Sequence, residues 1–174
     1  MAGTKLEVVD GDITRLKVDA VVNAANKKLA GGGGVDGAIH RAAGKEKLQK
    51  ACRQIGGCPT GEVRVTEGFD LPAKYIFHAV GPVWRDGAHG EDQQLAACYR
   101  NAIREAGERD VASIAFPAIS CGVYGFPMER AVDIAVSTVG DAVKSASGIE
   151  KVVFCCFDAE MAECYRDALA DRGD

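Results

Sequence analysis

Two asparagines and a run of glycines stand close together near the N-terminus of this 174-residue chain. Asn23 and Asn26 flank two alanines, and Gly31-Gly-Gly-Gly-Val-Asp-Gly37 follows, with a helical pattern directly behind it. Glycine has no Cβ, so the backbone N–H groups of such a run can approach a ligand closely. The start of the helix adds the positive end of its dipole, and together these features favour binding of phosphate. The alternative is a flexible strand-to-helix connector, with Asp36 simply favourable in the first helical turn.

A second loop with glycines, Pro117–Pro127, follows an apolar segment that ends at Phe116. The loop contains Ser120, a cysteine, two glycines and two aromatic residues, and Pro127 suits the first position of the next helix. One such loop could hold one phosphate, and two facing loops could hold a diphosphate and its flanking sugar. Taken by itself, this segment has a tight turn as its alternative interpretation.

Other candidate residues lie at strand ends or on the first helix. Asp12 follows the first strand and could accept a hydrogen bond from an exocyclic amine, although spacing alone favours an N-cap. Phe157 ends the last strand and could stack on a base, although a phenylalanine there is more often core. His40 lies on the same helix face as Asp36, where shaping a pocket and a structural role are about equally supported. His78, inside an apolar strand, is interpreted as a core residue.

Several familiar signatures are absent or incomplete. Gly32, Gly34 and Gly37 match the pattern GxGxxG, but Asn23–Ala30 separates this pattern from the apolar strand segment that precedes it. Position 57, where an acidic residue is required, is glycine, so a nicotinamide-dinucleotide fold is disfavoured. There is no P-loop lysine after the glycines, no GxSxG elbow, and no histidine or cysteine spacing of a metal site. The sequence therefore predicts neither a metal ion nor a resident cofactor.

The elements that must position these loops alternate along the chain. Apolar, β-branched runs predict strands at Leu6–Val9, Asp19–Asn23, Glu62–Glu67, Tyr75–Val80, Ser113–Phe116 and Lys151–Phe157. Apolar residues at helical spacing predict helices at Val35–Ala43 continuing to about Ala51, Asp92–Arg109, Glu129–Val143 and Ala159–Ala170. This alternation indicates an α/β protein with a largely parallel or mixed sheet covered on both faces. Ligands of such sheets bind beyond the carboxyl ends of strands, and both glycine loops fall there.

Composition narrows the classes of partner and location. The 21 basic and 25 acidic residues give a formal net charge of -4, which argues against bulk electrostatic binding of nucleic acid. No segment resembles a signal peptide or reaches the apolar length of a membrane span, so no membrane partner is expected. Seven cysteines without a CxxC pair favour reduced, mostly buried thiols in a cytoplasmic protein. With no linker or repeat, residues 1–174 are expected to form a single domain.

Short motifs occur along the chain in a distinctive order. Besides the two glycine loops, they are Gly11-Asp-Ile-Thr14, Asn23-Ala-Ala-Asn26, Ile39-His40, Leu71-Pro-Ala-Lys74 and His78-Ala-Val-Gly-Pro82. From about Leu6 to Arg166 this set resembles the macrodomain family, specifically its MacroD-type branch of bacterial O-acetyl-ADP-ribose deacetylases and ADP-ribosyl-protein hydrolases. The resemblance implies a three-layer α/β/α sandwich around a mixed, mostly parallel six-stranded sheet. It also implies that ADP-ribose binds in a cleft at the strand ends.

The resemblance implies a role for each candidate residue. Asp12 would contact the adenine amine, Ile13 would line the adenine site and Phe157 would pack on the adenine ring. The diphosphate would be held by two segments, namely Gly32, Gly33, Gly34 and Val35, and Ser120, Cys121, Gly122, Val123 and Tyr124. Asn26 would bind the distal ribose beside Asp36, and the walls of that ribose site would be Tyr124 and Phe126. Cys121 departs from the threonine that is common in the family, and places a thiol, predicted to be oxidation-sensitive, near the ligand.

The activity implied is hydrolysis of an ADP-ribose ester. The enzyme would remove acetyl from O-acetyl-ADP-ribose, mono-ADP-ribose from acidic side chains of proteins, or both. We expect Asp36 to orient or deprotonate a water, aided by the substrate's phosphate, while Asn26 fixes the distal ribose. ADP-ribose derivatives and ADP-ribosylated proteins are thus the expected partners, as substrate or product rather than cofactor. A non-catalytic ADP-ribose reader and an ADP-ribose 1″-phosphatase are the alternatives, and the Asn26–Asp36 pair favours an enzyme because binding alone does not require both residues.

Overall fold

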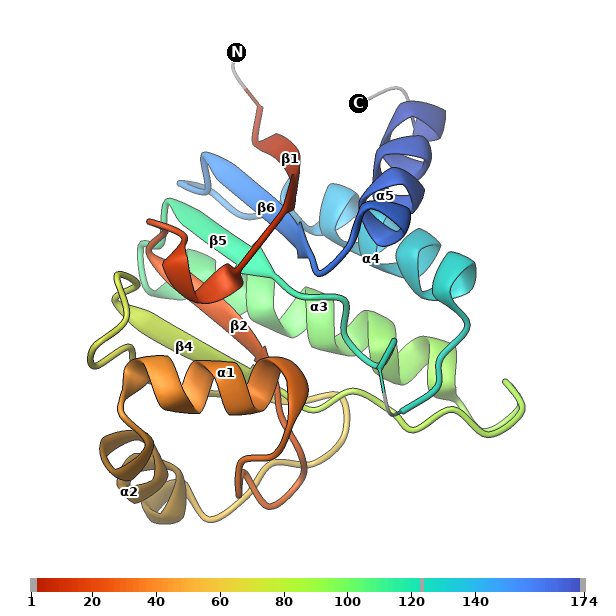
Figure 1. The fold of residues 1–174 in the computed structure, drawn as a ribbon. Coiled ribbons are helices and arrows are strands. Elements are labelled where there is room, and N and C mark those ends of the chain that lie inside the picture. The colour runs from red at the N-terminus through yellow and green to blue at the C-terminus, as the bar shows by residue number, and fades with distance from the viewer. Residues whose placement is uncertain (1–2, 123, 173–174) are drawn as a thin grey trace.

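The computed structural model describes residues 3–122 and 124–172. Within these ranges six strands are interspersed with helices along the chain, and only β3 and β4 follow each other without a helix between them (Figure 1). The strands are β1 (Lys5–Asp10), β2 (Ala20–Ala24), β3 (Val63–Glu67), β4 (Tyr75–Ala79), β5 (Ser113–Phe116) and β6 (Lys151–Cys156). The helices are the short 3₁₀ helix η1 (Ile13–Arg15), α1 (Gly34–Ala43), α2 (Lys45–Ile55), α3 (Glu91–Glu108), α4 (Met128–Ala142) and α5 (Ala159–Arg172). Every predicted strand is present, with ends within one residue of those expected.

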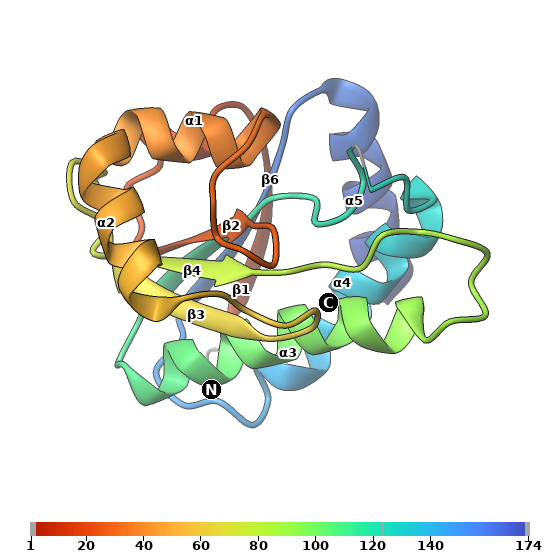
Figure 2. The same ribbon diagram turned by 90° about the horizontal axis from the view of Figure 1, so that it is seen from below.

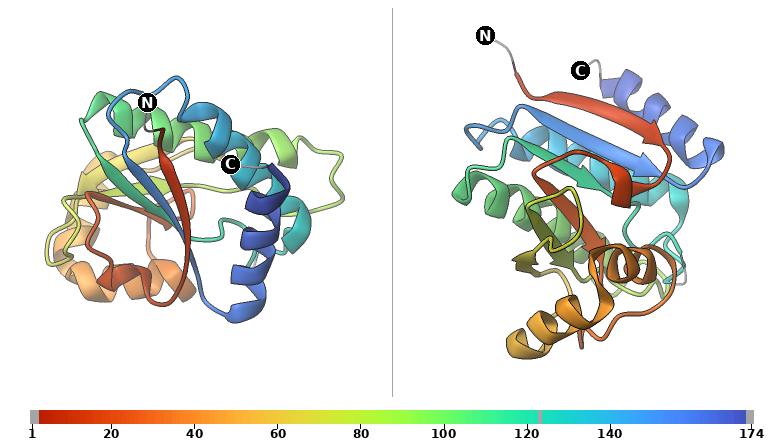
Figure 3. Two further views of the ribbon diagram at one scale, coloured as in Figure 1. Left: turned by 90° about the horizontal axis from the view of Figure 1, so that it is seen from above. Right: turned by 60° about the vertical axis from the view of Figure 1, so that its left-hand side comes forward.

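All six strands belong to one sheet, in the order β1-β6-β5-β2-β4-β3. Only β3 runs antiparallel to its neighbour, β4, and every other pair is parallel. The right-hand view of Figure 3 shows β1 and β6 side by side and pointing the same way, in the register Leu6 opposite Val152. The mixed, mostly parallel six-stranded sheet predicted from the sequence is therefore confirmed.

Helices cover both faces of the sheet. Figure 2 shows α1 and α2 on one side of the strands and α3 and α4 on the other, where α5 also packs. Consecutive strand residues alternate between the two apolar clusters: Val21 packs toward α1 and α2, whereas Val22 packs toward α3 and α4. Because both faces of the sheet are buried, the sequences of its strands are nearly continuous apolar runs. This is the three-layer α/β/α sandwich.

The predicted helix from Val35 to about Ala51 is wrong in one respect, since it is two helices that meet at Gly44. Gly44 has φ of 103°, a conformation that glycine adopts readily and other residues avoid. Its N–H still donates to His40 O, and Ala43 O accepts from Asp70 N, so the ends of both helices are tied down. A smaller correction concerns Pro127, which is the N-cap of α4 rather than its first residue, because its ψ of 129° is not helical.

The sheet brings five loops to one edge. Strands β1, β2, β4, β5 and β6 run parallel to one another, so their carboxyl ends face the same way. The residues that follow these strands are therefore neighbours in space, although they are far apart in the sequence. Within the described ranges, no helix combines the length and the apolar character needed to cross a membrane.

Candidate functional site

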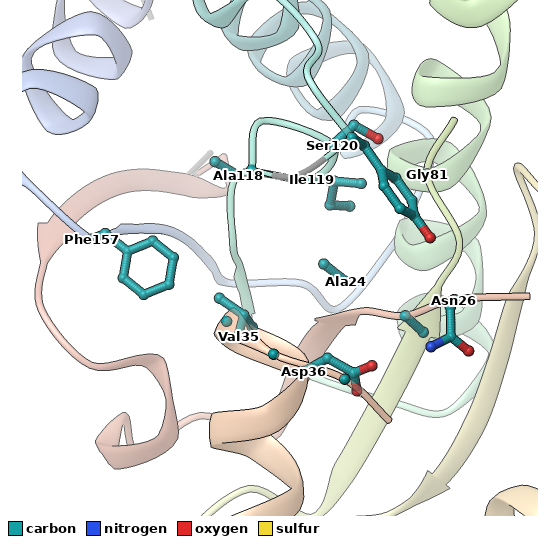
Figure 4. Close-up of a pocket in the computed structure, with 15 residues that line it drawn as sticks. Ala24, Asn26, Val35, Asp36, Gly81, Ala118, Ile119, Ser120 and Phe157 are labelled. Carbon is teal, nitrogen blue, oxygen red and sulfur yellow. The ribbon is translucent and has the colours of Figure 1, made fainter. Parts of the chain in front are cut away.

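The loops after β2 and β5 face each other across a central pocket of about 330 Å³. Figure 4 shows Phe157 at one end of this pocket and Asn26 at the other, with Val35 and Asp36 on one wall and Ala118, Ile119 and Ser120 on the opposite wall. Ten candidates from the sequence line it: Asn26, Gly32, Gly33, Gly34, Val35, Asp36, Ser120, Gly122, Tyr124 and Phe157. Sequence reasoning missed five further lining residues, whose small or apolar side chains gave no chemical signal: Ala24, Ala25, Gly81, Ala118 and Ile119.

Two further hollows adjoin the central pocket, one at each end. The Asp12 pocket, of about 410 Å³, shares Val35, Gly122 and Phe157 with the central pocket. It is lined by three more sequence candidates, namely Asp12, Ile13 and Cys121. The Lys27 groove, of about 660 Å³, lies at the other end and shares Asn26, Gly81 and Tyr124. A ligand lying along this cleft would thus pass from Phe157 at one end to Asn26 at the other.

The glycine loop presents the unpaired amino end of α1 to the central pocket. Gly33 is the N-cap of α1 and offers no side chain to the first-turn N–H groups, which are left for a ligand. Asn26 braces the loop from within, because its Nδ2 donates to Gly31 O (2.9 Å) and its Oδ1 accepts from Ala30 N (3.0 Å). Gly34 takes φ of 58°, the left-handed conformation that turns the chain into the helix. The loop is therefore braced by hydrogen bonds rather than loosely connected, and its geometry is one that an anion site requires.

The second loop is held against the chain that follows β4. Ser120 Oγ donates to Pro82 O (2.8 Å), and Ser120 O accepts from Phe126 N (2.9 Å). Ser120 itself has φ of 66°, which is uncommon for a residue other than glycine. The two segments approach so closely at Gly81 that a Cβ there would overlap Ser120 Oγ. The hydroxyl of Ser120 therefore anchors a loop that lines the pocket.

Asp36 is held by two donors on one of its carboxylate oxygens. Its Oδ1 accepts from Asn23 Nδ2 (2.8 Å) and lies 3.0 Å from His40 Nδ1, and all three residues are buried. Its Oδ2 lies 3.7 Å from the point where a Cβ on Gly32 would stand, and Asn26 Nδ2 lies 4.0 Å from the same point. Asp36 Oδ2, which has neither of these donors, therefore borders the same space beside Gly32 as the Asn26 amide does.

His40 connects Asp36 to α2. The hydrogen bond to the Asp36 carboxylate raises the pKa of the His40 imidazole. The contact between His40 Nε2 and Gln49 Nε2 (2.6 Å) favours the neutral imidazole instead, because the Gln49 amide can donate a hydrogen bond only to an unprotonated nitrogen. Gln49 Nε2 also donates to Leu29 O (3.1 Å), which ties α2 to the glycine loop. His40 therefore has a positioning role toward Asp36, deeper in the protein than the pocket surface.

Two buried residues behind Asp36, Asn23 and His78, were not assigned to the site by the sequence. Burial lowers the pKa of His78 to about 4, so its ring is neutral at pH 7. His78 Nε2 donates to Thr66 Oγ1 (3.0 Å), which leaves His78 Nδ1 to accept from Asn23 Nδ2 (3.1 Å). This chain of bonds fixes the amide of Asn23 with its nitrogen toward Asp36, and leaves Asn23 Oδ1 buried without a hydrogen-bond partner among the residues that the structure describes. His78 is thus a core residue, as predicted, but one bonded to the site.

The two candidates for base recognition differ in how the structure places them. Asp12 is the N-cap of η1: its Oδ1 accepts from Thr14 Oγ1 (2.7 Å) and Thr14 N (2.9 Å), and these bonds lower the pKa of Asp12. Its carboxylate nevertheless borders the Asp12 pocket as a charged acceptor. Phe157 is 73 % exposed, so the alternative that it is a core residue is wrong. An exposed phenylalanine at the junction of two pockets presents a ring face to a planar ligand.

Three candidates need correction or lie outside the described ranges. Phe126 is 3 % exposed, packs against Trp84 with ring centroids 4.8 Å apart, and lines none of the three hollows, so it does not form the wall predicted for it. Cys121 borders the Asp12 pocket, and burial raises the pKa of its thiol to about 11, which lowers the fraction of the reactive thiolate and argues against the expected sensitivity to oxidation. Val123 lies outside the described residues.

A single buried carboxylate organises the loop beside the Lys27 groove. Glu91 Oε2 accepts from the N–H groups of Arg85, Asp86 and Gly87, and Glu91 Oε1 accepts from His89 N. Asp86 and His89 also lie close to Glu91, but their side chains bond to each other. Since every Glu91 oxygen already has donors, this cluster is explained by loop structure and not by a metal ion.

We predict that Glu91→Gln loosens this loop in a pH-dependent way. Burial alone would raise the pKa of Glu91, but the backbone hydrogen bonds outweigh it and lower the pKa to about 2. The carboxylate therefore stabilises the fold fully above about pH 4.5, its unfolded value, and this contribution is lost as the pH falls toward 2. Urea unfolding of both proteins from pH 2.5 to 8 should give a constant stability difference at high pH that shrinks below pH 4.5. A difference independent of pH across this range would contradict the role assigned to the carboxylate.

Comparisons with known proteins place the chain in a family. The family model described as Macro domain matches residues 22–135, so the chain belongs to the macrodomain family. It is 54 % identical over 165 residues to a macro domain-containing protein of Chlorobaculum tepidum, covering 95 % of each chain. It is 52 % identical over 174 residues to a protein of Escherichia fergusonii named O-acetyl-ADP-ribose deacetylase, covering 98 % of each. Among solved structures, a variant of the Oceanobacillus iheyensis macrodomain with ADPR superposes with a TM-score of 0.91 at 41 % identity, covering 96 % of this chain and 92 % of the other.

Proposed function

We propose that the chain is a single macrodomain that binds ADP-ribose and hydrolyses its esters. The observation that carries this proposal is the pairing of a braced, glycine-lined anion site with Asp36 Oδ2 and Asn26 at one end of the pocket. The adenine would stack on exposed Phe157, with its amine toward Asp12 and its edge against Ile13. The diphosphate would take the N–H groups at the start of α1 and of the Ser120–Gly122 loop. The relative named O-acetyl-ADP-ribose deacetylase and the neighbour with ADPR support this ligand.

The distal ribose then lies between Asn26 and Tyr124, beside Asp36. Asn26 Nδ2 donates to Gly31 O and keeps a second hydrogen for the ribose. A water held by Asp36 Oδ2 attacks the ester, the bond between the acyl group and the ribose oxygen breaks, and that oxygen takes up a proton. The products are ADP-ribose and either acetate or a freed protein carboxylate. The uncommitted N–H groups stabilise the negative charge of the phosphates throughout. Cytoplasmic location remains a prediction from the thiol content.

A panel of three substrates tests this function. The purified protein would be incubated with O-acetyl-ADP-ribose, with a protein mono-ADP-ribosylated on glutamate, and with ADP-ribose 1″-phosphate. We expect turnover of one or both esters, with ADP-ribose appearing in amounts equal to the acid released. Binding of ADP-ribose without turnover of any substrate would make the protein a reader, and turnover of the phosphate alone would make it a phosphatase.

A further inference from the structure

The Lys27 groove begins where the central pocket ends. It shares Asn26, Gly81 and Tyr124 with that pocket and continues past Lys27, Arg85 and Gln94. If ADP-ribose lies with its adenine on Phe157 and its distal ribose at Asn26, as the proposed function requires, the group esterified to that ribose points into this groove. Its volume of about 660 Å³ falls in the usual range of ligand sites, roughly 300–1,000 Å³, and far exceeds what an acetyl group needs.

The side chains that line the groove include more basic groups than acidic ones. Lys27, Lys28 and Arg85 line it with exposed side chains, and within the described residues none of the three is in an ion pair or a side-chain hydrogen bond. Glu91, the one acidic residue among the described residues of the lining, is 2 % exposed and uses its oxygens on backbone N–H groups. In a chain of net charge -4, these three cations at one end of a substrate cleft form a site for an anionic partner.

The remaining lining favours a peptide over a nucleic acid. Val83 is 55 % exposed and, with Phe157, is one of two exposed large apolar residues in the part of the chain that the structure describes. Thr60 and Gln94 add hydroxyl and amide groups suited to a peptide backbone. Single-stranded nucleic acids stack their bases on successive aromatic side chains along a basic groove. Tyr124, which already borders the ribose end, is the one phenylalanine, tyrosine or tryptophan among the described residues that line this groove.

We propose that the Lys27 groove binds the polypeptide around the modified residue, and that Lys27, Lys28 and Arg85 select substrates in which this residue is flanked by acidic side chains. This inference rests on the proposed function and names its substrate class: ADP-ribosylated glutamate or aspartate within an acidic stretch. O-acetyl-ADP-ribose does not reach the groove, so its turnover is independent of these cations. The selection acts through charge and weakens when salt screens it.

The test compares three substrates on three proteins. The substrates are a peptide ADP-ribosylated on one glutamate with aspartate and glutamate neighbours, the same peptide with asparagine and glutamine neighbours, and O-acetyl-ADP-ribose. The proteins are the unaltered chain, the groove variant Lys27→Glu/Lys28→Glu/Arg85→Glu, and the control variant Lys17→Glu/Arg104→Glu/Lys144→Glu. The control makes the same change in net charge at exposed residues outside the lining of all three hollows.

We expect kcat/KM of the unaltered protein to be about tenfold higher for the acidic peptide than for the neutral one, a preference of roughly 1.4 kcal/mol. The groove variant should lose or reverse this preference, while its turnover of O-acetyl-ADP-ribose stays within about twofold. The control variant should keep the preference, and 0.5 M salt should reduce it in every protein that has it. An equal rate on both peptides in the unaltered protein, or a preference that survives in the groove variant, would overturn the proposal.

Binding measurements separate this inference from the proposed function. Calorimetry with the same two peptides, on protein carrying Asp36→Asn, reports the groove's preference without turnover. Acidic preference in binding together with absent hydrolysis in the unaltered protein would refute the proposed function and leave the groove assignment standing. A single-stranded oligonucleotide that displaces the acidic peptide at equal or lower concentration would overturn the choice of a peptide as the occupant.

Discussion

Asp36→Asn is expected to lower ester hydrolysis by about 10²–10⁴-fold while the affinity for ADP-ribose changes less than about threefold. Asn23 and His40 both donate toward the Oδ1 position, so an asparagine here is forced to place its carbonyl oxygen there. Its NH₂ group then replaces Oδ2, the oxygen that borders the space above Gly32. The side chain keeps its shape and its buried partners but presents a donor where a water must be deprotonated. Single-turnover hydrolysis and calorimetric titration with ADP-ribose measure the two quantities separately.

A matched control uses the same substitution at a carboxylate outside the cleft. Asp70 is exposed and pairs with Lys47 (2.8 Å), so Asp70→Asn removes a charge without touching the lining of the three hollows. Its turnover should equal that of the unaltered protein. Full turnover by Asp36→Asn, in a protein that still binds ADP-ribose, would show that the attacking water does not depend on Asp36.

Local patterns predicted the sheet well because its strands are buried on both faces. The apolar runs at Val21–Val22 and Ile114–Phe116 indicated strands of a covered sheet, and the glycine loops that follow these two strands were therefore expected at its carboxyl edge. That Asn26 and Asp36 line one pocket could also be expected, because both belong to the strand–loop–helix unit that crosses this carboxyl edge. The break at Gly44 was missed because alanines and charged residues continue a helical pattern on both sides of a single glycine.

Contacts between distant segments could not be predicted from spacing. Phe126 follows the loop as closely as Tyr124 does, yet it turns into the core because Trp84, more than 40 positions away in the sequence, packs against it. From the sequence, His78 is an ordinary core residue. Its contact with Asn23 exists because β4 pairs with β2 and the register of that pair places the two residues opposite each other. The exposure of Phe157 likewise depends on which elements cover the end of β6. Each of these depends on tertiary packing, which overrides the local pattern.

Gly37→Ala is expected to destabilise the fold by about 1–3 kcal/mol and to weaken ADP-ribose binding at least tenfold. A Cβ at this position would stand 2.5 Å from Gly32 O, a backbone atom of the loop that lines the pocket. Relief requires moving Gly32 away from α1, which displaces the N–H groups proposed to hold the diphosphate. Helix propensity alone makes the opposite prediction, because alanine is favoured over glycine inside a helix by roughly 0.5–1 kcal/mol. The sign of the change in unfolding free energy therefore decides between the two effects.

Gly107→Ala in α3 supplies the matched comparison. There the nearest atom to a new Cβ is the Ala146 Cβ at 3.7 Å, an ordinary contact, so propensity acts unopposed. Urea unfolding should show Gly107→Ala to be more stable than the unaltered protein and Gly37→Ala to be less stable, and calorimetry should show lost affinity only for the latter. If Gly37→Ala were stabilising, α1 would tolerate a side chain against the loop, and the close approach of Gly32 would not be what holds the anion site. Destabilisation with affinity intact would instead contradict the link between the position of Gly32 and diphosphate binding.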